Sequence, residues 1–251
     1  MPTPVIGPPA PVVLVPGLTL FDKLFGPDRP SPGHFPGVRA YFAARGVDVV
    51  LARVSPTAGV VTRAAELAAF VRARFGPRPV HLIGHSLGGL DARYAVSRLG
   101  LGARVLSLTT VGTPHRGTPF ADWGVARFAR LLRPLFAALR VPAGAFDDLT
   151  TAACARFNEA VPDVPGVIYR AVAGVCGKPW LGPEWRLPAG IVGRAEGPND
   201  GVVSVASATW GLATDIWLAD HLNLVNWPNR RMRKAGAWVD RAADYARLLP
   251  V

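Results

Sequence analysis

The segment Val80–Tyr94, VHLIGHSLGGLDARY, predicts a β-strand that turns abruptly into a helix. Its apolar start, Val80–Ile83, is typical of a buried strand, and the residues from 87 to 99 have helical spacing. Between them, Gly84-His85-Ser86-Leu87-Gly88 fits the pattern G-x-S-x-G. A serine held at so sharp a turn needs neighbours without Cβ atoms, which the glycines two residues before and after it provide. We therefore interpret Ser86 as a nucleophile. The alternative is a glycine-rich turn that has no catalytic role.

Apolar strands and amphipathic helices alternate on both sides of this segment. Such alternation predicts the α/β class, with a mostly parallel central sheet and helices on both faces. The length of 251 residues and the hydrophobic fraction of 50% suit a single domain over residues 1–251. We expect strands at 12–15, 47–54, 80–83, 105–111, 167–173 and 214–218, and helices at 34–46, 60–75, 87–99 and 229–248.

The alternation pauses at residues 118–160. This stretch is rich in large apolar side chains with arginines between them, and Pro134 and Pro142 divide it into short helical pieces. It follows the strand at 105–111, near the expected nucleophile. We predict a helical lid or cap over the site, and the alternative is a helix packed on the sheet.

The charge and cysteine content exclude several classes of protein. The net charge is +11, but its arginines are scattered, with no basic stripe interleaved with aromatic residues, so we expect no nucleic-acid partner. A basic face that approaches anionic lipid remains an option. No apolar run is long enough for a transmembrane helix. Cys154 and Cys176 either form a short-loop disulfide or are two buried thiols.

A serine nucleophile needs a base, and His221 is the best placed of the five histidines. It follows a late apolar strand, in the order nucleophile–acid–base. His34 precedes Ser86, and His81 lies inside a strand. His85 adjoins Ser86 but should point away from its hydroxyl. His115, at the end of the strand 105–111, is expected to shape the rim of the cleft.

The acid that orients the base should lie between Ser86 and His221. Asp200 sits on a turn before a short apolar run, from which a carboxylate can accept a hydrogen bond from the imidazole. The competing acids are Asp215, which is expected in or near a strand, and Asp220, whose side chain is adjacent to His221 in sequence and should face elsewhere. An oxyanion hole also needs two backbone N–H groups, for which we choose Leu87 and Leu18.

Taken together, four regions of the chain resemble the bacterial triacylglycerol lipases of the Pseudomonas/Burkholderia type, members of the α/β-hydrolase superfamily. They are Val15–Leu18 (VPGL), Ile83–Tyr94 (IGHSLGGLDARY), Val111–Gly117 (VGTPHRG), and Asn199–Ser204 (NDGVVS) with Asp220–Asn226 (DHLNLVN). The resemblance spans residues 12–227. It implies an α/β-hydrolase fold with a helical lid after Gly117. It also implies a triad of Ser86, Asp200 and His221.

The chain departs from this family at its first oxyanion loop and at its metal site. The family has His-Gly where this chain has Pro16-Gly17, so the N–H donor is kept and the histidine is lost. The family holds a structural calcium ion with an aspartate at the position of Asn223 and a glutamine at that of Trp227. A further aspartate is missing, although Glu184 is nearby. Losing charged ligands weakens the binding of a hard cation, which argues against calcium, and no cofactor is expected to be required.

The function expected is hydrolysis of carboxylic esters through an acyl-enzyme. The first choice is a lipase that acts on acylglycerols or other medium- or long-chain fatty acyl esters. The alternatives are a phospholipase, a short-chain esterase, a polyester depolymerase, acyl transfer to an acceptor other than water, and a non-enzymatic lipid-binding protein. The partner expected is a lipid or ester, in solution or at a lipid–water interface. Residues 1–11 do not fit a signal peptide, whereas the family resemblance implies secretion; the cytoplasm is the other option.

Overall fold

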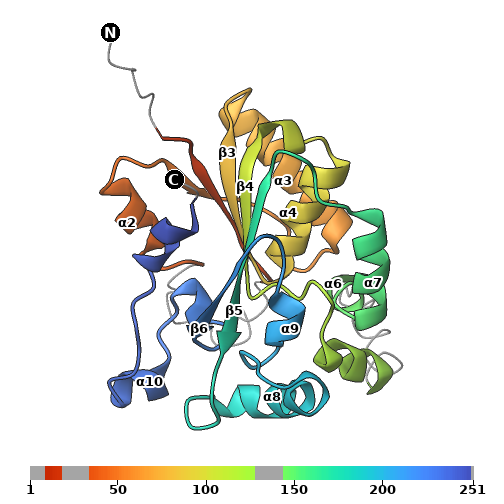
Figure 1. Ribbon diagram of the computed structural model, residues 1–251, viewed down its shortest axis with the longest axis vertical. Coiled ribbons are helices and arrows are strands. Elements are labelled where there is room, and N and C mark those ends of the chain that lie inside the picture. The colour runs from red at the N-terminus through yellow and green to blue at the C-terminus, as the bar shows by residue number, and fades with distance from the viewer. Residues whose placement is uncertain (1–8, 19–33, 128–143, 250–251) are drawn as a thin grey trace.

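A computed structural model describes residues 9–18, 34–127 and 144–249 of the chain. Its centre is a six-stranded, entirely parallel sheet in the order β2-β1-β3-β4-β5-β6 (Figure 1). The strands are β1 (Val12–Val15), β2 (Val49–Leu51), β3 (Val80–His85), β4 (Val105–Val111), β5 (Ile168–Val175) and β6 (Thr214–Leu218). The predicted α/β class is confirmed.

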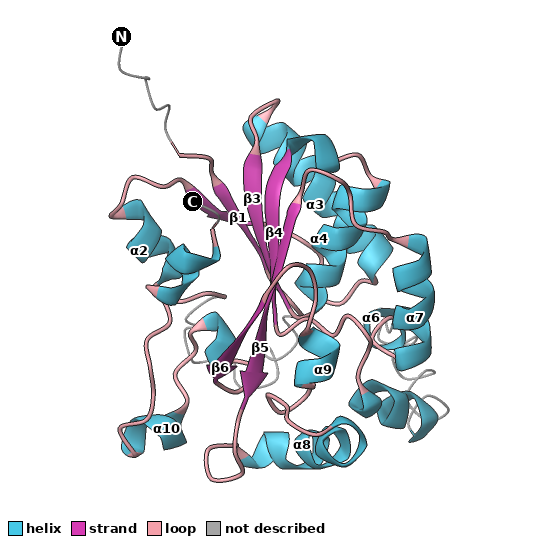
Figure 2. Ribbon diagram, viewed as in Figure 1, coloured by secondary structure: helices cyan, strands magenta, loops and turns pink. Residues whose placement is uncertain are grey.

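Helices lie on both faces of the sheet (Figure 2). They are α2 (Val38–Ala43), α3 (Val60–Phe75), α4 (Leu87–Arg98), α6 (Gly144–Asp147), α7 (Thr151–Ala160), α8 (Pro183–Glu196), α9 (Val205–Ala208) and α10 (Arg230–Lys234). A further helix covers residues 119–127. Short 3₁₀ turns occupy Gly102–Arg104, Asn223–Val225 and Asp244–Leu248.

Strand β1 shows how the apolar sequence builds two cores. Side chains alternate between the faces of a strand, so Val13 and Val15 join the core beneath α3 and α4, while Val12 and Leu14 join the core beneath α2. All four residues are fully buried. A strand that is apolar on both faces is the form expected inside a parallel sheet covered on both sides.

The register of the strands brings their carboxyl ends to one edge of the sheet. Val15 pairs with Gly84, Gly84 pairs with Thr110, and His85 pairs with Val111. The loops that follow β1, β3, β4, β5 and β6 therefore leave from the same edge. In open parallel sheets this is the edge where ligands and reacting groups gather.

Two sequence expectations about helices differ from the structure. The expected closing helix at 229–248 is wrong: α10 ends at Lys234, and Gly236 has a left-handed backbone, with φ +66°. The fourteen-residue helix α8 was not expected at all. Its boundaries carry the usual signs, with Pro183 in its first turn and Gly197 directly after its end, but Pro188 within it disguises the helical pattern.

The segment 118–160 is helical where the structure describes it, through residues 119–127, α6 and α7. Residues 128–143, which include most of the apolar side chains behind the lid prediction, lie outside the described part. None of the described helices has both the length and the apolar composition needed to cross a bilayer. The two cysteines are free buried thiols, so the disulfide alternative is wrong.

Candidate active site

Ser86 occupies a strained turn between β3 and α4. Its backbone angles are φ 53° and ψ −127°, in the region that favours glycine. A Cβ on Gly84 would lie 2.7 Å from the carbonyl oxygen of Gly88, and a Cβ on Gly88 would lie 2.5 Å from that of Val15. Both glycines are thus required by close backbone approach. The hydroxyl of Thr113, after β4, donates to the Ser86 carbonyl at 2.9 Å and secures the turn.

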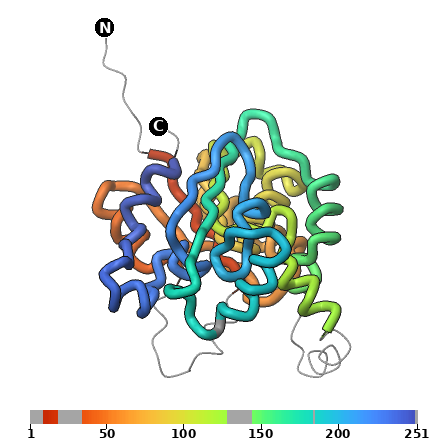
Figure 3. The backbone as a smooth tube through the Cα atoms, turned by 60° about the horizontal axis from the view of Figure 1, so that its bottom comes forward, coloured from red at the N-terminus to blue at the C-terminus, as the bar shows by residue number. Residues whose placement is uncertain are grey.

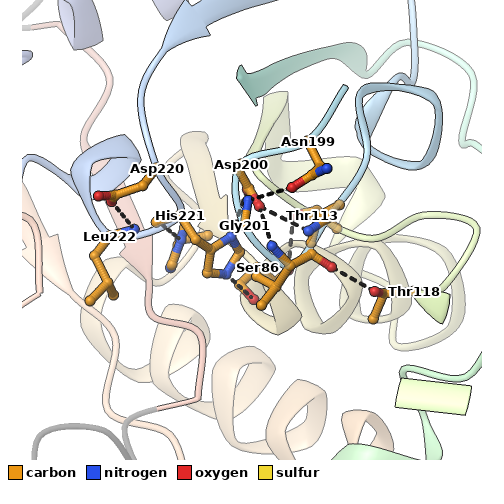
Figure 4. Close-up of polar contacts among 12 residues, drawn as sticks. Ser86, Thr113, Thr118, Asn199, Asp200, Gly201, Asp220, His221 and Leu222 are labelled. Atoms are coloured by element: carbon orange, nitrogen blue, oxygen red, sulfur yellow. Dashed lines mark hydrogen bonds and ion pairs between the residues drawn. The ribbon is translucent and has the colours of Figure 1, made fainter. Parts of the chain in front are cut away.

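Ser86, His221 and Asp200 form a continuous hydrogen-bonded chain (Figure 4). The Nε2 atom of His221 is 3.0 Å from Ser86 Oγ, and its Nδ1 atom is 2.7 Å from Asp200 Oδ2. Their exposed fractions are 9% for Ser86, 7% for His221 and 1% for Asp200. The imidazole is therefore placed to accept the serine proton while the carboxylate fixes its tautomer.

Backbone hydrogen bonds hold Asp200 at one oxygen of its carboxylate and at its own carbonyl oxygen. Its Oδ1 atom accepts hydrogen bonds from the N–H groups of Val202, at 3.0 Å, and Val203, at 2.8 Å. Its own carbonyl oxygen accepts from the N–H of His221 at 2.9 Å. Of the competing acids, Asp215 is exposed on β6, and Asp220 points into a different set of contacts.

Asp220 fastens the loop that carries His221. Its Oδ1 atom accepts from the N–H groups of Leu222, at 3.0 Å, and Asn223, at 2.7 Å. Its Oδ2 atom accepts from the side-chain amide of Asn229, which also reaches the carbonyl oxygen of Trp180 at 3.0 Å. Burial raises the pKa of Asp220, opposed by these hydrogen bonds. The network ties the His221 loop to the loop after β5.

The residues at the resembled family's calcium position do not fit a cation. The amide Nδ2 of Asn223 donates to the carbonyl oxygen of Trp227 at 3.1 Å, so these two positions are joined directly. Asn223 is fully buried, and its Oδ1 atom has no hydrogen-bond partner in the described part of the chain. A neutral amide supplies no charge for a hard cation, which prefers several oxygen ligands including carboxylates. No described cluster of three or more His, Cys, Asp or Glu side chains is arranged to bind a metal.

The proposed oxyanion donors flank Ser86. A Cβ on Gly17 would lie 2.9 Å from the Cβ of Ser86, so the loop after β1 passes directly beside the nucleophile, and Leu18 follows it. Leu87 is the first residue of α4, where backbone N–H groups have no acceptor within the helix. The positive end of the helix dipole also favours a negative charge at this position.

A buried ion pair connects this loop to the nucleophile's helix. The Nε atom of Arg63, on α3, lies 2.7 Å from Asp91 Oδ2, on α4, and both side chains are fully buried. The same guanidinium donates to the carbonyl oxygens of Pro16, at 2.6 Å, and Gly17, at 3.3 Å. Arg63 therefore fixes the position of the candidate oxyanion loop relative to α4.

Sequence reasoning missed this pair, although the pattern of α3 contained a sign of it. Arg63 lies on the helix face whose other members are apolar and buried, three residues after Val60 and four before Leu67. Asp91 is likewise among the buried residues of α4. A charge on an apolar helix face requires a buried partner, which is a recognisable sequence feature.

Two histidines besides His221 line the site. The His85 ring is tilted against that of His221, with ring centroids 4.7 Å apart, and its Nε2 atom is 3.1 Å from the His221 carbonyl oxygen. His34 lies 5.9 Å from His85 between ring centroids. Burial, with the nearby Arg63 and His221, lowers the pKa of His34 to about 4. Burial likewise lowers the pKa of His85 well below 6.5. Both rings are thus neutral at physiological pH.

His115 does not shape the cleft rim, contrary to the sequence expectation. It is fully buried and stacks on Trp210 at 5.0 Å between ring centroids. Its Nε2 atom is 2.9 Å from Thr110 Oγ1, and its carbonyl oxygen accepts from Asn158 at 2.8 Å. The neighbouring Pro114 lines the cavity instead. The tight turn after Gly112, which has φ +57°, directs the imidazole inward.

A narrow apolar cavity of about 80 Å³ lies over Ser86. Five of its lining residues come from the segment 118–160: Thr118, Phe120, Ala121, Phe146 and Leu149. Trp185, from the unexpected helix α8, faces the edge of the His221 ring at 6.3 Å. The remaining lining residues are Leu18, His34, His85, Ser86, Pro114, Val202, Val203, His221 and Leu222. Such a lining suits the apolar part of a substrate.

Comparison with known proteins identifies the family of the fold and several similar enzymes. A family model described as the alpha/beta hydrolase fold matches residues 52–240. Triacylglycerol lipase 2 of Saccharomyces cerevisiae is 31% identical over 207 residues, which cover 77% of this chain but only 62% of the yeast protein. A triacylglycerol lipase of Vibrio cholerae is 29% identical over 255 residues, which cover 86% of this chain and 79% of the other. The Staphylococcus hyicus lipase structure, 17% identical, shares the fold with a TM-score of 0.71 over 95% of this chain and 94% of its own.

Proposed function

The chain belongs to the alpha/beta hydrolase fold family, and from this premise we propose that it is a serine carboxylic ester hydrolase of the lipase type. The observation that carries the proposal is the chain of hydrogen bonds from Ser86 through His221 to Asp200. The similarity to triacylglycerol lipases over most of this chain supports an ester as the substrate.

In the proposed mechanism, Ser86 Oγ attacks the ester carbonyl carbon while His221 Nε2 takes the hydroxyl proton. Asp200 keeps the imidazole in the tautomer whose Nε2 accepts a proton, and it stabilises the imidazolium that forms. The N–H groups of Leu18 and Leu87 bind the oxyanion of the tetrahedral intermediate. His221 then gives its proton to the leaving alcohol. In the second half of the reaction, water attacks the acyl carbonyl carbon as His221 Nε2 takes its proton, and His221 returns a proton to Ser86 Oγ as the carboxylic acid leaves.

We propose medium- or long-chain acyl groups as the preferred substrates and the helical segment 118–160 as a lid. The apolar lining over Ser86 supports an apolar acyl chain. A volume of about 80 Å³ is, however, below the roughly 300 Å³ of an ordinary small-molecule site. A long acyl chain therefore requires Phe120 and Phe146 to move away from Ser86. Phe146 is already 42% exposed and lies at the border of the cavity.

The finer assignment to the Pseudomonas/Burkholderia type is supported by the four sequence motifs quoted above. The proposal differs from that family at the metal site, because we propose that no calcium ion is required. The hydrogen bond from Asn223 to Trp227 gives the His221 loop a direct link where the resembled family has two calcium ligands.

Hydrolysis of a series of chromogenic esters, from two to sixteen acyl carbons, tests this function. We expect turnover that persists or rises beyond eight carbons and falls at least a thousandfold in Ser86→Ala. Ser97→Ala, on the same helix α4, is the matched control and should retain activity. Turnover restricted to the shortest esters would reject the lipase assignment in favour of a short-chain esterase. Full activity in Ser86→Ala would reject the mechanism.

A further inference from the structure

A second and larger cavity lies beside the active site, between α8 and the loop that follows β5. Its volume is about 740 Å³, and it shares no lining residue with the cavity over Ser86. Helix α8 and the loop after β5 lie side by side at the bottom of Figure 1, the end of the molecule that comes forward in Figure 3. The volume is within the range of pockets that bind small organic molecules.

One face of helix α8 forms the hollow. Arg186, Ala189, Gly190, Gly193 and Arg194 all line the cavity, at the spacing i, i+3, i+4, i+7 and i+8 that places residues on one side of a helix. The three central residues have no side chain or only a methyl group. A Cβ added to Gly190 would meet only the Arg194 guanidinium, at 3.9 Å. The space therefore exists because small residues occupy the middle of this face.

The cavity is positively charged around an apolar lining. Arg186 and Arg194 stand roughly 12 Å apart along the helix, at 1.5 Å per residue, and Lys178 lies on the opposite wall. The apolar lining includes Val175 and Leu181, with the exposed Pro198 at the edge. None of the three cations forms an ion pair with a described residue, and no described side chain of the lining is a carboxylate.

Lys178, Arg186 and Arg194 are exposed, so water and salt screen their mutual repulsion, but all three attract an anion that lies between them. Arginine binds carboxylate and phosphate oxygens through two parallel hydrogen bonds, and lysine adds a point charge. A bare inorganic ion would gain nothing from contact with Leu181. The apolar lining therefore favours an anion that also carries an apolar chain.

We propose that this cavity binds the oxyanion head group and first methylene groups of an anionic amphiphile. Choosing an amphiphile rests on the proposed function, since hydrolysis of a fatty acyl ester releases a long-chain carboxylate. A lipid phosphate presents the same chemistry. Arg186, Arg194 and Lys178 bind the head group, and the small residues of α8 admit the chain beside Leu181.

Calorimetric titration of the whole protein with dodecanoate and with dodecyl phosphate tests the proposal. Dodecanol, which has the chain without the charge, and inorganic phosphate, which has the charge without the chain, are the control ligands. We expect at least one of the two anions to bind, and to bind at least tenfold more tightly than either control ligand. The stronger of the two anions identifies the head group. The double variant Arg186→Gln/Arg194→Gln should weaken this binding about tenfold or more. Gly190→Leu, which fills the cavity without a backbone clash, should weaken it as well.

The matched control is Arg230→Gln/Lys234→Gln, which removes the same charge from exposed positions of α10 and should bind as the unchanged protein does. Short-chain ester turnover should be unchanged in all three variants. Equal binding by all variants would overturn the proposal, as would equal losses in the α8 and α10 variants. If inorganic phosphate binds as tightly as dodecyl phosphate, the assignment of an amphiphile as the ligand is overturned. Turnover retained in Ser86→Ala would count against the proposed function and leave the binding result standing.

Discussion

The Nε atom of Arg63 lies 2.7 Å from Asp91 Oδ2 inside the protein, where neither side chain is exposed to water. This pair joins two parts of the proposed mechanism, the nucleophile and the first oxyanion donor. Asp91 belongs to the helix that begins after Ser86, and Arg63 also donates to the carbonyl oxygens of Pro16 and Gly17, directly before Leu18. The distance between the nucleophile and the first oxyanion donor therefore depends on one guanidinium.

Replacing Arg63 with methionine should reduce both stability and turnover. The change leaves the Asp91 carboxyl buried without its partner, which costs about 3–5 kcal/mol of unfolding free energy, and it releases the Pro16–Gly17 loop. The double variant Arg63→Met/Asp91→Leu should recover much of the stability but not kcat, because the loop stays free. Urea unfolding and ester kinetics measure both. A wild-type kcat in the double variant would contradict a positioning role for Arg63. The control is Arg74→Met, which changes an exposed arginine on the same helix.

Gly88→Ala should abolish activity by displacing the nucleophile. The added Cβ would lie 2.5 Å from the Val15 carbonyl oxygen and 2.6 Å from that of Pro16, neither of which can rotate away. We expect at least a hundredfold loss of kcat/KM with a lowered Tm. Gly124→Ala, in the helix at 119–127, meets nothing within 4 Å and should be neutral or slightly stabilising. Equal kcat/KM and Tm in the two variants would show that the turn at Ser86 tolerates a Cβ at position 88.

Acid should destabilise the protein between pH 6.5 and pH 4. Burial lowers the pKa of His34 to about 4 and those of His85 and His115 well below 6.5. Over this range the unfolded chain binds protons that the native state does not, so the free energy of unfolding falls as pH falls. Each histidine contributes up to about 1.4 kcal/mol per pH unit. Asp91 opposes this trend, because burial raises its pKa to about 7 and the native state gains a proton there.

The buried histidines, which include His81, outweigh the two aspartates with raised pKa values, Asp91 and Asp220, so the net expectation is a loss of stability on acidification. Urea unfolding at pH 7.0 and pH 5.0 measures it, and His34→Gln should reduce the difference between the two pH values. An unfolding free energy that stays constant or rises towards pH 5.0 would contradict the neutral state of these rings.

Removal of divalent cations should leave the protein unchanged. The Asn223 amide donates to the Trp227 carbonyl oxygen at 3.1 Å, and the Asp220 carboxylate is occupied by the N–H groups of Leu222 and Asn223. We expect dialysis against EDTA to shift Tm by less than about 1 °C and to leave kcat unaltered, since nothing that binds only the native state is lost. A lower Tm after dialysis that calcium restores would show that the loop of His221 holds a cation.

Most of the sheet could be predicted from the sequence, because buried parallel strands are short apolar runs. Val12–Val15, Val105–Val111 and Thr214–Leu218 have the predicted bounds. The candidate triad could be selected for similar reasons: the strained turn at Ser86 requires particular neighbours, and chain order restricts the choice of base. Local constraints of this kind leave a visible pattern in the sequence.

The parts that escaped prediction depend on contacts between distant residues. Arg63 and Asp91 are 28 residues apart, and their pairing follows from the packing of α3 on α4. The segment 229–248 has helical periodicity, but the helix ends at Lys234, Gly236 has a left-handed backbone, and Tyr245 packs against Trp217 from a separate 3₁₀ turn. His115 was misplaced because the direction of its side chain depends on the turn at Gly112.

The central claim is that Ser86 is the nucleophile for esters with long acyl chains. A long-chain alkyl phosphonate reacts with an activated serine and occupies the acyl site, so peptide mass spectrometry after labelling tests both properties together. We predict one adduct on Ser86, loss of ester turnover in proportion to labelling, and no adduct in Ser86→Ala. An adduct on another residue, or full turnover in protein labelled completely at Ser86, would contradict the account.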